Sequence, residues 1–238
     1  MPQLFAGTSG FSYASWKPGF YPARMPSKNF LSHYAERLNS TEVNYTFRQL
    51  PKQSTLESWV NATPSHFVFS LKAHMRLTHI LKLQNAGEFL EVFLKAVDPL
   101  RTARRLGPIL FQLPPSFPCD PERLATFAGQ LPADMKFAFE FSHLSWLNDA
   151  VYRTLEQHGI ALCLAESEKL VVPEILTAPF VYARLRKPDY SAEDRAEIAL
   201  RAKTLLAGGR DLYLYFKHEE TPDGALYAQE LLAKFARE

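Results

Sequence analysis

Short apolar segments rich in aromatic and branched residues recur along this chain, and most are followed by a stretch with helical signals. Eight of them are predicted strands: Leu4–Gly7, Ser40–Thr46, Phe67–Lys72, Ile109–Leu113, Lys136–Phe141, Ile160–Glu166, Phe180–Leu185 and Asp211–Lys217. Each unit takes up about 30 residues, the size of one strand with its helix. We therefore predict one domain over residues 1–238, a parallel eight-stranded (β/α)8 TIM barrel.

The predicted helix boundaries rest on local signals. Asp120 is a capping acceptor placed before Pro121, a residue that tolerates the first helical position. Ser54–Glu57 and Ser191–Asp194 resemble capping boxes. Ser145 is expected to start a further helix.

Alternation within the strands predicts which side chains face the barrel axis. Phe67, Phe69 and Leu71 are expected to face the helices, so Ser70 and Lys72 face inward. Other inward polar residues near the strand ends are Glu42, Asn44, Gln112, Glu140, Glu166, Arg184, Tyr215 and Lys217. Barrel enzymes place their active sites at the carboxyl ends of the strands. The pattern therefore predicts a polar ring at that mouth.

The acidic members of the ring fall on neighbouring strands. Glu140 and Glu166 end the fifth and sixth strands, and two close carboxylates repel. One of them is expected to take up a proton, hold a cation or meet a base. Glu42 and Lys72, on the second and third strands, are expected to form an ion pair.

The basic members of the ring belong to the last two predicted strands. Arg184 and Lys217 end the seventh and eighth strands, with Arg186 near the rim. The loops after these strands are the usual phosphate site of this fold. The first loop contributes aromatic residues, and we expect Tyr13 and Trp16 to form a wall beside the polar ring.

Composition narrows the class of protein. The chain is 47% hydrophobic with a formal charge of +2, too mild for binding that rests on bulk attraction to nucleic acid. Two cysteines in no metal or redox spacing favour a reducing compartment. The sequence contains neither a signal-peptide pattern nor an apolar run of the ~20 residues that a membrane helix needs, so a cytoplasmic protein is expected.

A set of short motifs runs through almost the whole chain. They are Gly7–Gly10, Tyr13, Trp16, Phe20–Pro22, Glu42–Asn44, Thr46–Phe47, Thr63–Pro64, Phe67, Phe69, Lys72–Ala73, Thr78–His79, Gly107–Pro108, Gln112–Phe117, Glu140–Phe141, His143, Ser145–Trp146 and Tyr182–Leu185. Together they resemble the family known as domain of unknown function 72, or YecE-like. The resemblance implies a TIM barrel and brings no established reaction.

The chain departs from that family's pattern at three places. Ser142 stands where the family has an arginine before the histidine that follows strand five. Arg186 and Lys187 replace a His-Gly pair after strand seven, and Lys217 and His218 replace asparagines at the end of strand eight. The resemblance therefore implies that this member binds a variant of any shared ligand, or binds it differently.

The first functional hypothesis is a hydrolase or lyase acting on an anionic substrate, such as a phosphate-bearing small molecule or a nucleotide. Arginine and lysine would hold the anion, and Glu140 or Glu166 with a raised pKa would be the general base. The catalytic candidates are Glu42, Lys72, His79, Glu140, His143 and Glu166. The substrate-binding candidates are Tyr13, Trp16, Asn44, Gln112, Trp146, Arg184, Arg186, Tyr215 and Lys217.

Three alternatives stay open. A metal-dependent hydrolase would use the acidic ring residues with the two loop histidines, although the sequence requires no cofactor and the lysines would compete for the carboxylates. A Schiff-base enzyme would use Lys72 or Lys217 with a depressed pKa. A non-catalytic nucleic-acid or nucleotide binder would stack bases on aromatic residues beside basic ones. The oligomeric state is left open.

Overall fold

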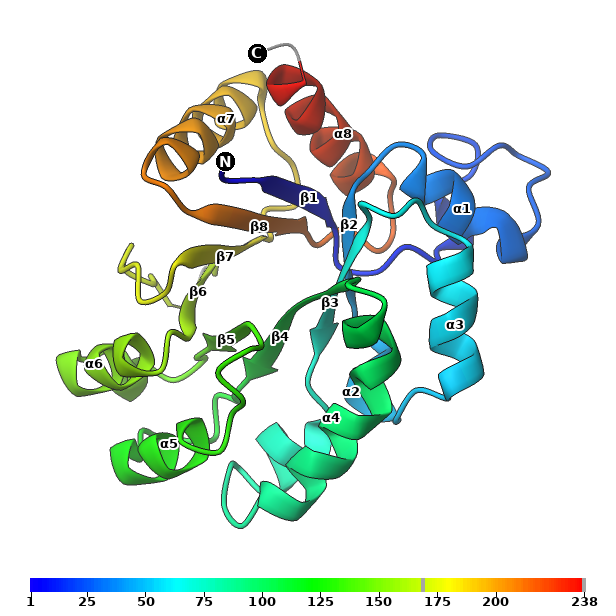
Figure 1. Cartoon of the computed structure of the whole chain (residues 1–238). Coiled ribbons are helices and arrows are strands. Elements are labelled where there is room, and N and C mark those ends of the chain that lie inside the picture. Colours follow the sequence, from blue (N-terminus) through cyan, green and yellow to red (C-terminus); the bar gives the residue numbers. More distant parts are fainter. Residues whose placement is uncertain (168–169, 237–238) are drawn as a thin grey trace.

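The computed structural model describes residues 1–167 and 170–236, and its strands form one parallel sheet curled into a barrel (Figure 1). The strands are β1 (Leu4–Thr8), β2 (Ser40–Val43), β3 (Val68–Lys72), β4 (Leu106–Gln112), β5 (Phe137–Glu140), β6 (Ala161–Ala165), β7 (Phe180–Leu185) and β8 (Asp211–Phe216). Hydrogen-bonded neighbours run in the order β1-β8-β7-β6-β5-β4-β3-β2. All eight predicted strands are confirmed, and the fold is the predicted (β/α)8 TIM barrel.

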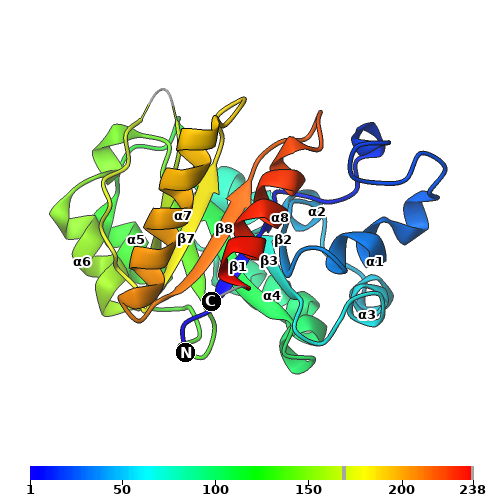
Figure 2. The same cartoon turned by 90° about the horizontal axis from the view of Figure 1, so that it is seen from above.

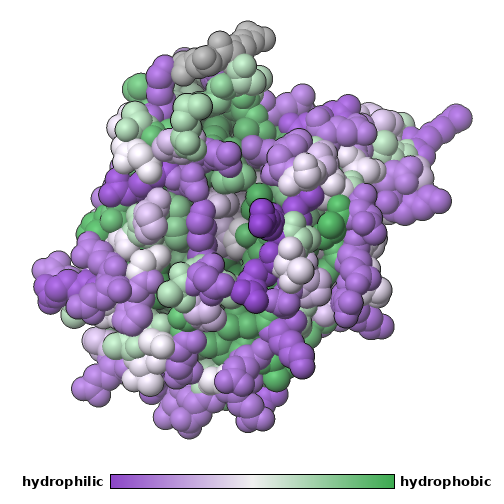
Figure 3. Space-filling model, viewed as in Figure 1, coloured by the Kyte–Doolittle hydropathy of each residue, from purple (hydrophilic) through white to green (hydrophobic). Residues whose placement is uncertain are grey.

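Helices surround the barrel, and the N-terminus and the end of α8 lie on the side where the strands begin (Figures 1 and 2). They are α1 (Phe30–Ala35), α2 (Tyr45–Arg48), α3 (Gln53–Asn61), α4 (Gly87–Thr102), α5 (Pro121–Ala128), α6 (Asp149–Gln157), α7 (Ala192–Ala207) and α8 (Asp223–Phe235). Hydrophilic residues cover most of the face seen in Figure 3, with smaller apolar areas between them. Within the described part of the chain, every helix is too short or too polar to cross a bilayer.

Two of the predicted helix starts are confirmed and two are wrong. Asp120 caps α5, and Ser191 caps α7 in a complete capping box. Helix α3 begins earlier than the motif at Ser54 predicts, with no side-chain cap. Helix α6 begins after Asn148, which accepts two first-turn N–H groups, whereas the Ser145 hydroxyl accepts the N–H of a neighbouring loop.

The predicted alternation is confirmed, because the buried residues fall into two groups on opposite sides of the sheet. Phe67, Phe69 and Leu71 belong to the core between strands and helices. The barrel interior contains Tyr182 and Tyr215 among its buried side chains. The second strand is shorter than predicted: Asn44 and Thr46 lie beyond Val43, where the backbone has already turned toward α2.

Side chains close the barrel where β1 meets β2. Asn39 accepts the N–H of Ala6 at 2.9 Å and donates to the carbonyl of Leu4 at 2.7 Å. The Tyr34 hydroxyl accepts the N–H of Thr8 at 2.8 Å and contacts the carbonyl of Ser40 at 3.1 Å. Polar backbone groups that a regular ladder would pair are thereby satisfied across the junction.

Gly7 permits this approach of the two strands. A methyl group on its Cα would lie 1.8 Å from the carbonyl oxygen of Ser40 and 2.6 Å from the Tyr34 hydroxyl. The first of these atoms is backbone, so β1 and β2 would have to separate to make room.

We expect Gly7→Ala to lower the free energy of unfolding by about 3 kcal/mol, because the added methyl group overpacks a junction where backbone already lies 1.8 Å away. Chemical denaturation followed by circular dichroism measures the change. Gly129→Ala is the matched control, since its methyl would meet only ordinary contacts at 3.5 Å or more and its φ is −64°. Equal stability of the two variants would contradict this account of the junction.

Candidate functional site

A buried ion network crosses the carboxyl end of the barrel. Arg184, 3% exposed, donates from Nη1 to Glu140 Oε2 at 2.6 Å and from Nη2 to Glu42 Oε1 at 2.7 Å. Arg186 contacts both oxygens of Glu140 at 2.7 Å. Two positive and two negative side chains therefore balance one another in a place where an isolated charge would be expensive.

Neutral side chains occupy the remaining acceptor positions of the two carboxylates. Ser9 Oγ donates to Glu42 Oε1 at 2.5 Å, and the Tyr182 hydroxyl donates to Glu42 Oε2 at 2.6 Å. Gln112 donates to Glu140 Oε1 at 2.6 Å. Three of the four carboxylate oxygens thus accept two or more hydrogen bonds, and the fourth, Glu42 Oε2, accepts one from Tyr182.

Glu140 does not have the raised pKa expected of a general base. Burial alone would raise its pKa, but Arg184 and Arg186 outweigh burial and lower the pKa from 4.5 to about 2. A carboxylate with so low a pKa is a poor proton acceptor at neutral pH. The expectation of a raised pKa at Glu140 is therefore corrected: the arginines hold its carboxylate ionised.

Glu166 is engaged by the loop that follows β7. Its Oε2 accepts the N–H of Arg186 at 2.7 Å and a short hydrogen bond from the Tyr190 hydroxyl. Glu140 faces the arginine side chains instead. The repulsion expected between the two carboxylates is thus offset, because Glu140 and Glu166 each accept hydrogen bonds from separate donors.

Lys72 is not the ion-pair partner of Glu42. Its ammonium lies 4.1 Å from the centroid of the Phe47 ring, and Arg184 takes the carboxylate instead. Burial lowers the pKa of Lys72, the positive charge of Arg184 lowers it further, and the value falls from 10.5 to about 8. The Lys72 amine makes no hydrogen bond or ion pair with any residue in the described part of the chain.

Two more basic groups lie near Lys72. The charge of Lys217 contributes to lowering the Lys72 pKa, and the exposed Lys217 ammonium has no ion-pair partner within residues 1–167 and 170–236. Burial and then Lys72 lower the pKa of His79, whose ring contacts Phe47 with centroids 5.1 Å apart. These three residues form what we call the basic cluster: Lys72, His79 and Lys217.

The two predicted tryptophan contacts are corrected, because both indoles are fully buried. Trp16 packs against Tyr21 within an aromatic cluster. Trp146 stacks on Phe141 and donates to the carbonyl of Phe117 at 2.7 Å. Their area is used for packing, as is usual for large aromatic side chains.

The other predicted contacts divide between the interior and the rim. Tyr215 is fully buried, and its hydroxyl bonds to two serines inside the barrel, so it is a structural residue rather than a substrate contact. Asn44 donates to Ser9 at 3.0 Å and supports the network.

Tyr13 is half-buried beside Ser9, where burial and then nearby carboxylates raise its pKa. His143 Nδ1 pairs with Ser145 at 2.7 Å and makes no bond to the network.

The acidic residues and histidines of the mouth are not arranged as metal ligands. No group of three or more His, Cys, Asp or Glu side chains able to hold a metal ion occurs among the residues that the structure describes. The carboxylates of Glu42 and Glu140 face arginines, which occupy the positions that a cation would need.

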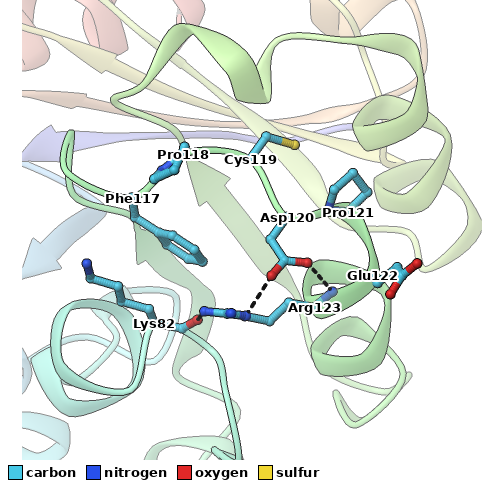
Figure 4. Close-up of a pocket in the computed structure, with 8 residues that line it drawn as sticks. All are labelled: Lys82, Phe117, Pro118, Cys119, Asp120, Pro121, Glu122 and Arg123. Atoms are coloured by element: carbon cyan, nitrogen blue, oxygen red, sulfur yellow. Dashed lines mark hydrogen bonds and ion pairs between the residues drawn. The ribbon is translucent and has the colours of Figure 1, made fainter.

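Two cavities open near the carboxyl ends of the strands. One of about 610 Å³ is lined by Glu166 and Arg186 together with apolar residues that include Leu164. The other, of about 640 Å³, lies between the loop after β3 and the start of α5 (Figure 4). There Asp120 and Arg123 point toward one another and Lys82 lies beside Phe117, and none of the predicted site residues lines it.

Sequence reasoning missed the supporting residues Ser9, Phe47 and Tyr190. Ser9 belongs to a glycine-flanked turn, and its only signal was that position at the end of a strand. Phe47 and Tyr190 lie in segments after β2 and β7, so alternation within strands says nothing about where they point.

We expect Glu140→Gln to lower the free energy of unfolding by about 3 kcal/mol at pH 7, because it leaves Arg184 and Arg186 without their shared counter-charge. A lowered pKa contributes stability above its unfolded value, and that contribution is lost as the pH falls from 4.5 toward about 2. The difference between wild type and variant should therefore shrink over this window.

Thermal unfolding at a series of pH values measures that difference. Glu91→Gln, an exposed residue of α4, is the matched control and should follow wild type throughout. A constant difference between wild type and Glu140→Gln down to pH 2 would show that the carboxylate charge is not what stabilises the network.

Comparison with known proteins agrees with this architecture. The UPF0759 protein YunF of Bacillus subtilis (strain 168) is 27% identical over 138 residues, which are 56% of this chain and only 49% of that relative. A crystal structure of a DUF72 family protein from Thermotoga maritima superposes with a TM-score of 0.87 at 25% identity, over 99% of this chain and 100% of that one.

A second DUF72 structure, from Enterococcus faecalis, has a TM-score of 0.78 at 16% identity over 100% of this chain and 99% of its own, and it shares the fold. Residues 5–238 match the family model described as "Protein of unknown function DUF72". The family resemblance of the sequence motifs is therefore confirmed, and the chain belongs to the DUF72 family.

Proposed function

We propose that this chain is an enzyme of the hydrolase or lyase class that acts on a small phosphate-bearing anion at the carboxyl-end mouth of the barrel. One observation carries the proposal: Lys72 and Lys217 lie near enough for their charges to interact, and neither has an ion-pair partner among residues 1–167 and 170–236. The network beside them has charges that cancel. The mouth therefore has a positive charge that an anionic ligand would balance.

The residues then take different roles from those that the sequence suggested. Lys217 follows β8, at the position where this fold usually binds phosphate, and its exposed ammonium is free to contact a ligand. Lys72 supplies the reactive amine, because an amine with a pKa of about 8 is partly neutral near neutral pH. Arg184 and Arg186 hold the carboxylates in place and do not bind the anion themselves.

Nucleotide or nucleic-acid binding without catalysis is the second candidate. The segment from Lys72 to Gly87 contains no acidic residue, and Arg76 packs over the Phe89 ring at 4.8 Å. This segment would extend the positive surface away from the mouth, as a phosphate backbone requires.

Isothermal titration calorimetry of the protein with glycerol 3-phosphate, and with glycerol as the uncharged counterpart, tests the first candidate. Neither compound contains a carbonyl group, so only binding is measured. We expect the phosphate ester alone to bind, and Lys217→Met to weaken that binding by about tenfold through the loss of one charge-assisted contact. Lys95→Met, an exposed lysine of α4, is the matched control and should bind as wild type does.

Equal affinity of the phosphate ester for wild type and Lys217→Met contradicts the proposed anion site. Binding of a single-stranded oligonucleotide that persists at physiological salt, together with failure to bind glycerol 3-phosphate, would favour the second candidate.

A further inference from the structure

Contacts of both the backbone and the side chain hold Lys72 in place. Its carbonyl accepts a hydrogen bond from Thr46 Oγ1 at 2.7 Å, and its backbone pairs with Leu110 of the next strand. The half-buried side chain then passes the Phe47 ring with its amine 4.1 Å from the centroid. A long and flexible side chain is thus held at the mouth rather than extended into solvent.

In the described part of the chain the amine has no hydrogen-bond or ion-pair partner, and the carboxylates whose charges act on it, those of Glu42 and Glu140, are engaged by other donors. Arg184 and Ser9 occupy Glu42 Oε1, while Tyr182 occupies Oε2. A lysine that served only to balance Glu42 would instead contact it. An unprotonated fraction of the amine is favoured here by burial and by the neighbouring charge of Arg184.

We infer that Lys72 is a covalent nucleophile that forms a Schiff base, and that the substrate is an anionic aldehyde or ketone whose negative group lies against Lys217. The inference rests on the proposed function and names its substrate class. An amine nucleophile needs to be held, partly desolvated and free of a counter-ion, and Lys72 meets all three conditions.

The reaction balances with groups already at the mouth. The neutral amine of Lys72 adds to the carbonyl carbon, and its proton moves to the oxygen to give a carbinolamine. A further proton lets the oxygen leave as water, and a C=N bond forms as a protonated imine. In a substrate with a hydroxyl group on the β-carbon, a base takes the hydroxyl proton, the Cα–Cβ bond breaks to release an aldehyde, and the electron pair of that bond passes into the imine to give an enamine. The protonated base returns its proton to the enamine carbon, which restores an imine. Addition of water to this imine then releases the remaining carbonyl product and the Lys72 amine.

His79 is suited to move the protons in these steps. Burial and Lys72 lower its pKa, so its imidazole is neutral near pH 7 and able to accept a proton. Its Nδ1 pairs with Thr78 at 2.8 Å, and its other ring nitrogen has no hydrogen-bond partner in the described part of the chain.

Borohydride trapping tests the inference on the whole chain. Glyceraldehyde 3-phosphate and its uncharged counterpart glyceraldehyde are the matched probes, and peptide mapping by mass spectrometry locates the reduced adduct. We expect the phosphorylated aldehyde to label Lys72 selectively, Lys72→Arg to remove this adduct, and Lys217→Met to reduce labelling by the phosphorylated probe about tenfold. Lys95→Met should be labelled at Lys72 as wild type is.

The pH dependence separates Lys72 from ordinary surface lysines. Its labelling rate should rise with pH and level off above about 8, because only the neutral amine attacks, whereas surface lysines should continue to gain reactivity toward about 10.4. Labelling spread evenly over surface lysines, or no adduct at Lys72, overturns the inference. Such a result, with glycerol 3-phosphate binding still dependent on Lys217, would leave the proposed anion site standing.

Discussion

The need to compensate Arg184 organises the mouth of this barrel. A guanidinium that is 3% exposed requires opposite charge and hydrogen-bond acceptors nearby. Glu42 and Glu140 supply the charge from β2 and β5, and Arg186 balances the second carboxylate. The polar residues around them follow from the same requirement, because each remaining oxygen of a buried carboxylate needs a donor.

These contacts change the roles that the sequence predicts for the acidic and basic residues. The arginine side chains pair with Glu42 and Glu140, the loop after β7 holds Glu166, and the arginines lower the pKa of Glu140. The same arrangement leaves the Lys72 amine without an ion-pair partner in the described part of the chain, with the charges of Arg184 and Lys217 lowering its pKa against those of Glu42 and Glu140. The chemistry that we propose therefore belongs to the amine, while the acidic residues are paired with the arginines and with neutral donors.

The sequence predicts the architecture well because the direction of a side chain in a strand follows from its position relative to its immediate neighbours. Arg184, Glu140 and Glu42 were all expected to face the axis, and they do. Their pairing was not predictable from neighbouring strands, since β7 is adjacent to neither β2 nor β5 in the sheet. A closed barrel brings inward side chains together across its axis, so a long arginine reaches partners that strand order does not suggest. Burial of Trp16 and Trp146 likewise depends on loop packing.

Barrel closure and charge compensation are coupled through Ser9. Its backbone forms the isolated bridge between the end of β1 and Glu42, and its hydroxyl donates to the Glu42 carboxylate. The same hydroxyl lies 3.2 Å from Arg184. Because β1 and β2 meet through such contacts rather than a full ladder, a separation of these strands would remove a donor from Glu42 and disturb its bond to Arg184. The contacts of the network are therefore complete only when the first and second strands are in place.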